Sequence, residues 1–209
     1  MSTKANRRSI EELRAEAIRE ARGMIAEGGL DKVKARLLAL RLGVSVGMIY
    51  NLFGRLDELL FHVSASVYEE LQAAIEADLE IARAKSASTT DLMLCLSQTY
   101  LHFVAANQDL WSGVLAFNRR GKQEVPDWYH AKERAILGIA ETTIAGLSSD
   151  LPQNKAALAA TALWAAVHGI VTVSIGRGGL IATEEEVWAQ ISLVVTSVAA
   201  TLENEASTG

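Results

Sequence analysis

The chain has 209 residues, with 20 Lys and Arg against 25 Asp and Glu, which gives a formal net charge of −5. This length suffices for one small and one larger domain. The negative charge argues against a general nucleic-acid coat protein, and the single cysteine, Cys95, excludes an internal disulfide and a cysteine-cluster zinc site. An amino end that is charged through Glu12 does not have the pattern of a signal peptide, so we expect a cytoplasmic protein.

The charges are distributed unevenly along the chain. Residues 1–60 hold 11 Lys and Arg and 8 Asp and Glu, a net charge of +3. Residues 61–209 hold 9 and 17, a net charge of −8. An anionic partner such as nucleic acid would therefore bind at the amino-terminal end.

The first predicted elements are three short helices with a sharp turn between the second and the third. A periodic apolar stripe from Ile10 to Ile25 predicts the first helix, and Asp31 is the nearest capping candidate for the second. Gly43 suits a left-handed turn residue, and Ser45 is the predicted N-cap of the third helix. This order is typical of a helix-turn-helix, although any tight corner in an all-α protein would use the same residues.

Further helices are predicted over the rest of the chain, and no stretch shows sustained strand alternation. We therefore predict an all-α fold, with a helix-turn-helix domain at 1–55 and a larger helical domain at 56–209, to which the features below assign ligand binding and dimerisation. The helices of the larger domain are expected at about 57–84, 89–107, 109–119, 126–147, 153–175 and 184–204.

Two apolar helices near the carboxyl end predict a homodimer. Residues from Ala156 to Gly176 include no charged side chain, but their small residues favour a buried core or interface helix over a membrane span. An apolar stripe follows on the helix at 184–204, formed by Val187, Ile191, Val194, Val195, Val198 and Leu202. Two copies would pair through the helices near 153–175 and 184–204, unless both helices bury these faces within a monomer.

Aromatic side chains gather in the larger domain and could line a ligand pocket. The predicted ligand-binding residues are Tyr100, Phe103, Trp111, Phe117, Trp128, Trp164 and His168. Each of them could equally be plain core. No two histidines have metal-pair spacing, and the sequence contains no nucleophile motif or phosphate loop, so we expect no metal, no cofactor and no enzymatic activity.

The third helix has a small, uncharged outer face that would fit the major groove of duplex DNA. Cationic side chains around it, Arg8 and Arg41 among them, would contact phosphates, unless they form surface ion pairs with nearby carboxylates such as Glu12 and Asp57. The predicted DNA-binding residues are Lys34, Arg36, Ser45, Val46, Gly47, Met48, Tyr50, Asn51 and Arg55.

These residues also carry a resemblance to a known family. Over about residues 10–62 the motif positions are Glu27–Leu30, Ala39, Gly43–Ser45, Gly47, Ile49, Tyr50, Phe53, Asp57, Leu59 and Leu60. In their order and spacing the chain resembles the TetR family of bacterial transcriptional regulators. The resemblance implies a homodimer in which each amino-terminal domain reads a half-site and the carboxyl-terminal domain senses a ligand. The run Ala162–Ile170 also resembles a Trp-His-Gly signature of one TetR subgroup.

Four positions depart from the family pattern. Val33 lacks the usual capping oxygen, and Leu56 replaces a usual Lys, for which Arg55 could substitute. Val46 and Leu52 stand where polar or basic residues are common. The prediction is a ligand-responsive regulator, a repressor that binds a palindromic double-stranded DNA operator and an unknown small-molecule effector. The alternative is a helical ligand- or protein-binding dimer with a degenerate DNA-binding module.

Overall fold

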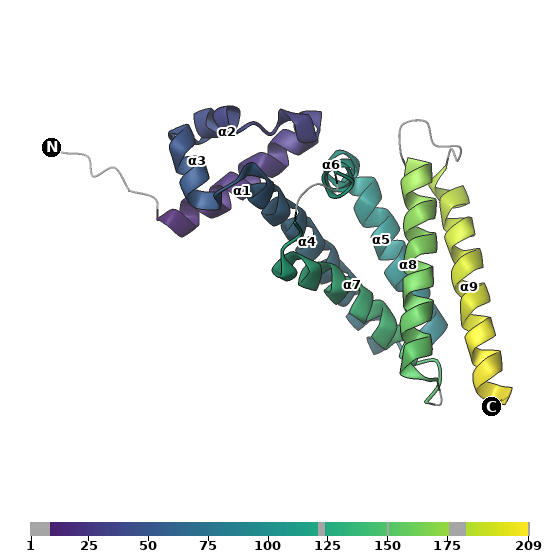
Figure 1. Ribbon diagram of the computed structural model, residues 1–209. Helices are drawn as coiled ribbons and strands as arrows, with labels where there is room; N and C mark the ends of the chain where they lie inside the picture. Colours follow the sequence, from purple (N-terminus) through teal and green to yellow (C-terminus); the bar gives the residue numbers. More distant parts are fainter. Residues whose placement is uncertain (1–8, 121–123, 150, 176–182, 209) are drawn as a thin grey trace. The chain divides into compact units, whose positions relative to one another are not determined.

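The computed structural model describes residues 9–120, 124–149, 151–175 and 183–208, and every regular element among them is helical. The all-α prediction is therefore confirmed for these residues. In chain order the elements are α1 (Ile10–Gly28), η1 (Leu30–Lys32), α2 (Ala35–Leu42), α3 (Val46–Phe53), α4 (Leu56–Ala84), α5 (Thr89–Ala106), α6 (Gln108–Asn118), α7 (Asp127–Ala145), α8 (Gln153–Ile175) and α9 (Glu184–Thr208) (Figure 1).

The chain forms two compact units. Unit 1 consists of residues 1–67 and 109–125, and unit 2 of residues 68–108 and 126–209. Helix α4 is continuous through residue 67, so its first turns belong to unit 1 and the remainder to unit 2. The domain boundary after residue 55 stays a prediction.

Unit 1 is built around the buried face of α1. Ala17, Ala21 and Met24 are fully buried on this face, and α2 and η1 pack next to it. Helix α6 joins the same core, although some 80 residues separate it from α1 in the chain. The rings of Phe61 and Phe117 meet edge to face with their centroids 4.9 Å apart, an arrangement favoured by aromatic quadrupoles.

The capping of α2 differs from the prediction. Asp31 lies in the short 3-10 turn η1 and not at the start of α2. The N-cap of α2 is Lys34, whose side chain forms no capping hydrogen bond. Asp31 instead accepts a hydrogen bond from Arg120 at 3.0 Å. Lys32, Val33 and Lys34 separate Asp31 from the first residue of α2, so Asp31 does not stand at the N-cap position.

Unit 2 is a helical bundle in which α7 packs on α8, α8 on α9, and α9 on α5 (Figure 1). The core includes Leu71, Tyr100, Tyr129, Val171 and Ile191, each at most 1 % exposed. The predicted stripe of α9 faces this core through Val187, Ile191, Val195 and Leu202, whereas Val194 and Val198 are only partly buried. Most of that stripe is therefore buried within one protomer. For α9 this corresponds to the alternative stated above, in which the apolar face is covered within a monomer and not by a second copy.

Helix α8 is the one helix among the described residues that is long and apolar enough to cross a membrane, over Gln153–Ser174. Core helices of soluble proteins meet the same criterion. Ala160 and Val171 of α8 are fully buried in unit 2, whereas Leu158 and Val173 are 71 % and 57 % exposed. One side of α8 therefore belongs to the core of the bundle and another is open.

Candidate nucleic-acid interface and ligand cavity

The turn between α2 and α3 has the geometry of a helix-turn-helix. Gly43 ends α2 with φ 67° and ψ 35°, a left-handed conformation that favours glycine, and the amide of Val44 donates back to the Ala39 carbonyl at 3.0 Å. The Ser45 hydroxyl accepts a hydrogen bond from the Met48 amide at 3.2 Å and so caps α3. The chain bends by 105° between the two helices, within the range of such motifs.

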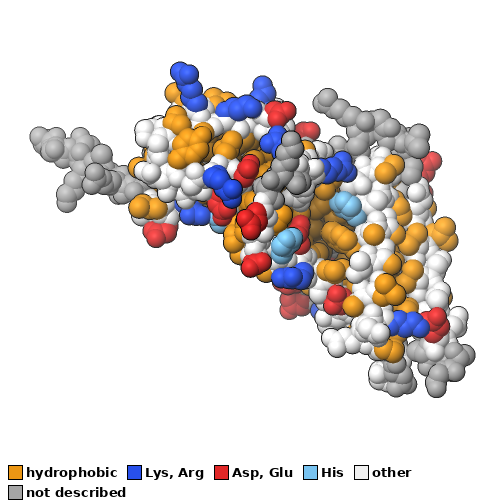
Figure 2. All heavy atoms as spheres, viewed as in Figure 1, with side chains coloured by type: hydrophobic (Ala, Val, Ile, Leu, Met, Phe, Trp, Pro, Cys, Tyr) orange, Lys and Arg blue, Asp and Glu red, His pale blue; other side chains and the backbone are white. Residues whose placement is uncertain are grey.

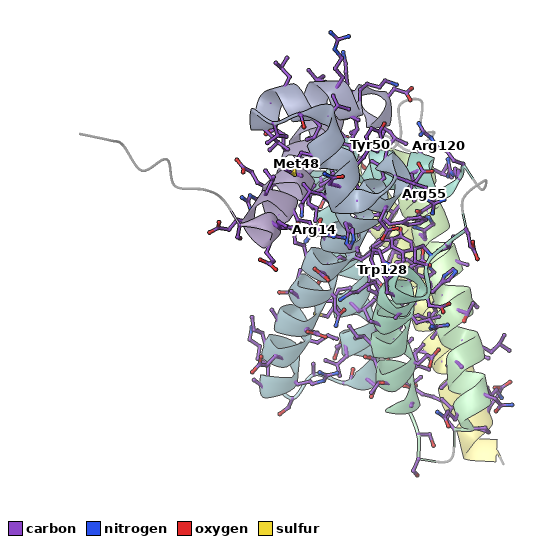
Figure 3. The ribbon with its side chains drawn as sticks, turned by 60° about the vertical axis from the view of Figure 1, so that its left-hand side comes forward. Arg14, Met48, Tyr50, Arg55, Arg120 and Trp128 are labelled. Atoms are coloured by element: carbon purple, nitrogen blue, oxygen red, sulfur yellow. The ribbon has the colours of Figure 1, made fainter. Side chains whose placement is uncertain are left out.

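Helix α3 divides sharply into a buried and an exposed side. Ile49, Leu52 and Phe53 are at most 6 % exposed and hold the helix on the core of unit 1. The opposite side presents Tyr50, which is 48 % exposed, with Met48 on the same helix (Figure 3). Burial of Tyr50 would have argued against a binding role for this helix, and the tyrosine is not buried.

Glycine at position 47 leaves open space on the exposed side of α3. A Cβ atom added at Gly47 would have the Ser45 hydroxyl oxygen, 3.8 Å away, as its nearest neighbour. Packing within the chain therefore does not require glycine at this position. The absent side chain instead keeps the backbone at the start of α3 accessible to a binding partner.

Arg14 holds the far end of α3 in place. Its guanidinium donates to the Leu52 carbonyl at 2.9 Å and to Nε2 of His62 at 2.7 Å, and it lies 4.9 Å from the centroid of the Phe53 ring. One α1 side chain thus satisfies a carbonyl at the end of α3 and links α3 to α4 (Figure 3). The sequence analysis missed this positioning residue, because the contact spans 38 residues of chain.

The cationic side chains considered as phosphate contacts differ in whether a carboxylate already binds them. Lys34, Arg36 and Arg55 are exposed, and within the described part of the chain Lys34 and Arg36 form no ion pair. Arg41, in contrast, binds Glu20 at 2.8 Å and Glu27 at 2.7 Å. Arg7 and Arg8 lie outside the described residues.

An ion pair was one of the two alternatives for Arg41, but its partners are Glu20 and Glu27 and not the carboxylates named from the sequence. The hydrogen bond and the positive charge of Arg41 lower the pKa of Glu27. The carboxylates of Glu27 and Glu20 in turn raise the pKa of Arg41 further above its ordinary value. Arg41 is thereby committed to a local ion pair. Of the predicted phosphate contacts, Lys34, Arg36 and Arg55 remain accessible to an anionic partner.

An open surface hollow of about 620 Å³ lies between α2 and α3. Its lining includes Lys34 and Arg36 from the start of α2, Leu40 from its last turn, and Ser45 and Val46 from the start of α3. Leu40 was not among the residues predicted to bind DNA, because an apolar side chain in a helix is usually part of the core. In the structure Leu40 is 75 % exposed.

Unit 2 contains a separate, apolar cavity of about 30 Å³ between α5, α7, α8 and α9. A water molecule needs about 10 to 15 Å³ of such space, so the cavity has room for about two waters. Its lining holds no charged side chain and consists of Met93, Leu96, Ser97, Tyr100, Ala140, Thr143, Ile144, Ala160, Leu163, Trp164, Val167 and Val195.

Of the predicted ligand-binding residues, the structure brings Tyr100 and Trp164 to this cavity. His168 does not line the cavity but contacts both of these residues. Its Nδ1 lies 2.7 Å from the Tyr100 hydroxyl, and its ring stacks on Trp164 with centroids 5.7 Å apart. Trp111 and Phe117 are buried in unit 1 and do not belong to this lining. Neither Phe103 nor Trp128 lines it. The aliphatic lining residues gave no sequence signal, because they follow the same pattern as core.

The histidines of the described residues are held in local contacts that a structural role explains. His102 lies 3.3 Å from Glu184, and His130 lies 3.1 Å from Glu133. Burial and the nearby Asp78 carboxylate raise the pKa of the Cys95 thiol, which disfavours the reactive thiolate. In this part of the chain no three His, Cys, Asp or Glu side chains are grouped as metal ligands would be.

Comparison with known families identifies the chain. A family model described as the tetracyclin repressor-like C-terminal domain matches residues 93–195. These residues include most of the helices that enclose the cavity of unit 2. The chain belongs to the TetR family of transcriptional regulators. No curated protein matches the chain in sequence.

Several solved structures share the TetR fold of this chain. A protein of unknown function from Rhodococcus sp. RHA1 is 21 % identical, with a TM-score of 0.72 and 98 % of each chain covered. The TetR-family transcriptional regulator PfmR from Thermus thermophilus is 19 % identical, with a TM-score of 0.60 and coverage of 86 % of this chain and 97 % of PfmR. RolR, solved in complex with the ligand resorcinol, is 18 % identical, with a TM-score of 0.59 and coverage of 96 % of this chain and 95 % of RolR.

Three residues that depart from the TetR family pattern differ in whether they are buried or exposed. Val33 is 3 % exposed and Leu52 is 6 % exposed, so both pack in the core of unit 1. Val46 lies on the surface at 38 % exposure, where its side chain faces any partner of α3. Only one of these three departures therefore changes the exposed surface of the helix-turn-helix.

Proposed function

We propose that this TetR-family regulator is a ligand-responsive repressor that binds a palindromic double-stranded DNA operator as a homodimer. The observation that carries the proposal is the exposed side of α3, open at Gly47 and Tyr50, next to the exposed cations Lys34 and Arg36. Phosphates need cationic donors, and base edges need an uncharged helix that can enter the major groove. The helix-turn-helix provides both.

The predicted DNA contacts follow from these positions. Lys34, Arg36 and Arg55 would bind phosphates and set the orientation of the module on the duplex. Ser45, Val46, Gly47, Met48, Tyr50 and Asn51 would face the base edges. In a dimer the two copies of α3 would be separated by about 34 Å, which matches successive major grooves on one side of the duplex.

Dimerisation through α8 and α9 is supported by large apolar side chains that one protomer leaves exposed. Leu158 and Val173 on α8 and Leu193 on α9 are 57 to 71 % exposed, although the two helices pack against each other on their other sides. A second copy of the pair would complete a four-helix interface. The proposed interface thus uses these outward faces and not the buried stripe of α9.

The interface is tested by Leu193→Glu, which would place a charge in the buried centre of the dimer. Sedimentation at micromolar concentration should then give monomer for this variant and dimer for the parent chain. Ile81→Glu is the matched control, because Ile81 is also a large exposed apolar residue, at 53 %, but lies on α4. A parent chain that sediments as a monomer would remove the proposed homodimer.

The cavity of unit 2 is the proposed effector site. Its charge-free lining favours a compact, uncharged and mainly apolar molecule, because burying an unpaired ion there would be costly. Ser97 and Thr143 donate to carbonyls of their own helices at 2.9 and 2.8 Å, which leaves mainly their acceptor capacity for a ligand. The resorcinol bound to the similarly folded RolR supports a small-molecule effector here too.

The size of the cavity supports coupling between ligand and DNA. Pockets for drug-sized ligands measure about 300 to 1,000 Å³, so a space of about 30 Å³ must widen before an effector enters. A ligand that needs the widened state binds the two states of unit 2 with different affinity, which is the requirement for a population shift. Helix α4, continuous from unit 2 into unit 1, would transmit the change to the helix-turn-helix.

The proposed function is tested by selecting bound sequences from a random duplex pool with the full chain. The expected result is a motif with two inverted half-sites, whose binding weakens as salt rises. Recovery of no enriched duplex would contradict the proposal. It would favour a ligand- or protein-binding dimer with a degenerate DNA-binding module, an alternative that the absence of cations from α3 keeps open.

The effector site is tested separately on a selected duplex. Small uncharged aromatic compounds are screened for release of the duplex, and active compounds are tested again on a Leu163→Trp variant, in which the added ring would fill the cavity. We expect this variant to hold the duplex and to lose its response to the compounds. An unchanged response would place the effector site elsewhere.

A further inference from the structure

The exposed face of α3 is apolar and uncharged. No residue from Val46 to Phe53 is Lys, Arg, Asp or Glu. Val46 and Tyr50 lie four residues apart, on the same side of the helix, and are 38 % and 48 % exposed. The remaining exposed polar side chain of this helix is Asn51. Helix α3 therefore offers a partner the apolar surfaces of Val46 and Tyr50, the tyrosine hydroxyl and one amide, and no charge.

Val46 lies next to another exposed apolar side chain and close to two cationic ones. Leu40 lines the hollow between α2 and α3 together with Val46, and Lys34 and Arg36 line it from the start of α2. Figure 2 shows hydrophobic side chains on the surface over α2 and α3 with Lys and Arg next to them. This pattern suits a duplex, in which phosphates flank the bases of the groove. It fits less well with a purely apolar protein partner.

The chemistry of the major groove limits what such a helix can read. Guanine is read chiefly by Arg or Lys, adenine by Asn or Gln, and the C5 methyl of thymine is the apolar group that a base edge presents there. The first residues of a recognition helix are those that reach base edges, and Val46 is the first residue of α3. A helix with Val46, Tyr50 and Asn51 on its surface therefore matches A·T pairs.

We infer that Val46 and Tyr50 read the operator through thymine methyl groups, so that each half-site carries A·T pairs beneath α3. This inference rests on the proposed function, because it requires that α3 enters the major groove. It adds the class of base pair that the helix selects and the two side chains that make the selection.

The test replaces thymines of a duplex selected by the full chain with deoxyuridine, one position at a time. Uracil keeps the base pair and lacks only the methyl group. At the positions beneath α3 we expect affinity to fall about fourfold for each methyl removed, the factor that burial of one such apolar group supplies. Thymines outside the half-sites should show no effect.

Two variants assign each methyl group to its side chain. Val46→Ala should abolish the uracil effect at one position of the half-site, and Tyr50→Ala should abolish it at another. Val125→Ala is the matched control, since Val125 is also exposed, at 36 %, and lies outside α3. The uracil series uses the unaltered protein, so it decides the inference even if a variant fails to fold.

The outcomes separate the inference from the proposed function. A selected duplex that binds equally well with uracil at every position would overturn the methyl readout and leave the regulator intact. Half-sites composed of G·C pairs beneath α3 would do the same. Failure to recover any duplex would overturn both, and would leave the apolar surface of α2 and α3 to a protein partner.

Discussion

The sharpest prediction compares two arginines of the same short helix, Arg36 and Arg41. Arg36 is exposed and forms no ion pair within the described residues, whereas Arg41 is bound to Glu20 and Glu27 at 2.8 and 2.7 Å. A phosphate contact releases counterions, so the logarithm of the affinity falls with the logarithm of the salt concentration, with a slope of about −0.9 for each contact. Arg36→Gln should reduce this slope, and Arg41→Gln should not.

The magnitude follows from the proposed dimer. Two copies of Arg36 bind each operator, so Arg36→Gln removes two phosphate contacts and changes the slope by about 1.8. Between about 50 and about 200 mM salt the parent chain should then lose about 12-fold more affinity than the variant. Arg41→Gln should leave the slope at the value of the parent chain, because the charge of Arg41 is already neutralised by Glu20 and Glu27.

Fluorescence anisotropy with a labelled, selected duplex measures both slopes at four or more salt concentrations. Equal melting temperatures of the three proteins would show that a difference between their slopes is not caused by a loss of folding. The reasoning is refuted if Arg36→Gln leaves the slope unchanged, or if Arg41→Gln lowers it as much as Arg36→Gln does. The first result would remove Arg36 from the interface, and the second would mean that DNA displaces the carboxylates from Arg41.

Two further predictions concern stability. A Cβ atom at Gly113 would lie 2.2 Å from Cγ2 of the buried Ile25, so Gly113→Ala should destabilise the protein by about 1 to 2 kcal/mol. Gly23→Ala, with nothing within 4 Å, should stabilise it by up to about 1 kcal/mol, and urea unfolding of both variants checks the contrast. Hydrogen bonds from the Ser88 hydroxyl and amide lower the pKa of Asp91. The stability that these hydrogen bonds contribute is therefore present above the ordinary pKa of Asp and is lost as the pH falls through the lowered pKa. Ser88→Ala should flatten this acid-side dependence in a pH series of melting temperatures, and an unchanged profile would show that the cap does not act through Asp91.

The helix-turn-helix could be predicted because its determinants are local. Gly43 adopts the left-handed conformation, and Ser45 caps α3 through the Met48 amide, as expected from residue types four positions apart or fewer. The helices of unit 2 were predicted within a few residues for the same reason, since polar breaks and apolar stripes mark their ends. The all-α fold and the family followed from these local patterns.

The parts that could not be predicted depend on contacts between distant segments. Trp111 and Phe117 were candidates for one ligand pocket together with Tyr100, with plain core as the alternative, but α6 packs in unit 1, where the close approach of Gly113 to Ile25 joins it to α1. Arg14 reaches the end of α3 across 38 residues. No periodicity within a helix shows which other helix covers it, so the assignment of aromatic residues to a ligand site needed the structure.

A Gly47→Glu variant shows whether the exposed side of α3 binds duplex DNA. The structure leaves room for a side chain at this position, and a glutamate in the first turn of a helix is favourable to folding. The measurement is a footprint of both proteins on one selected duplex, with melting temperatures compared. We expect two protected patches one helical turn apart for the parent chain and none for a folded Gly47→Glu variant. An equally strong footprint from that variant would show that DNA does not bind against this side of α3.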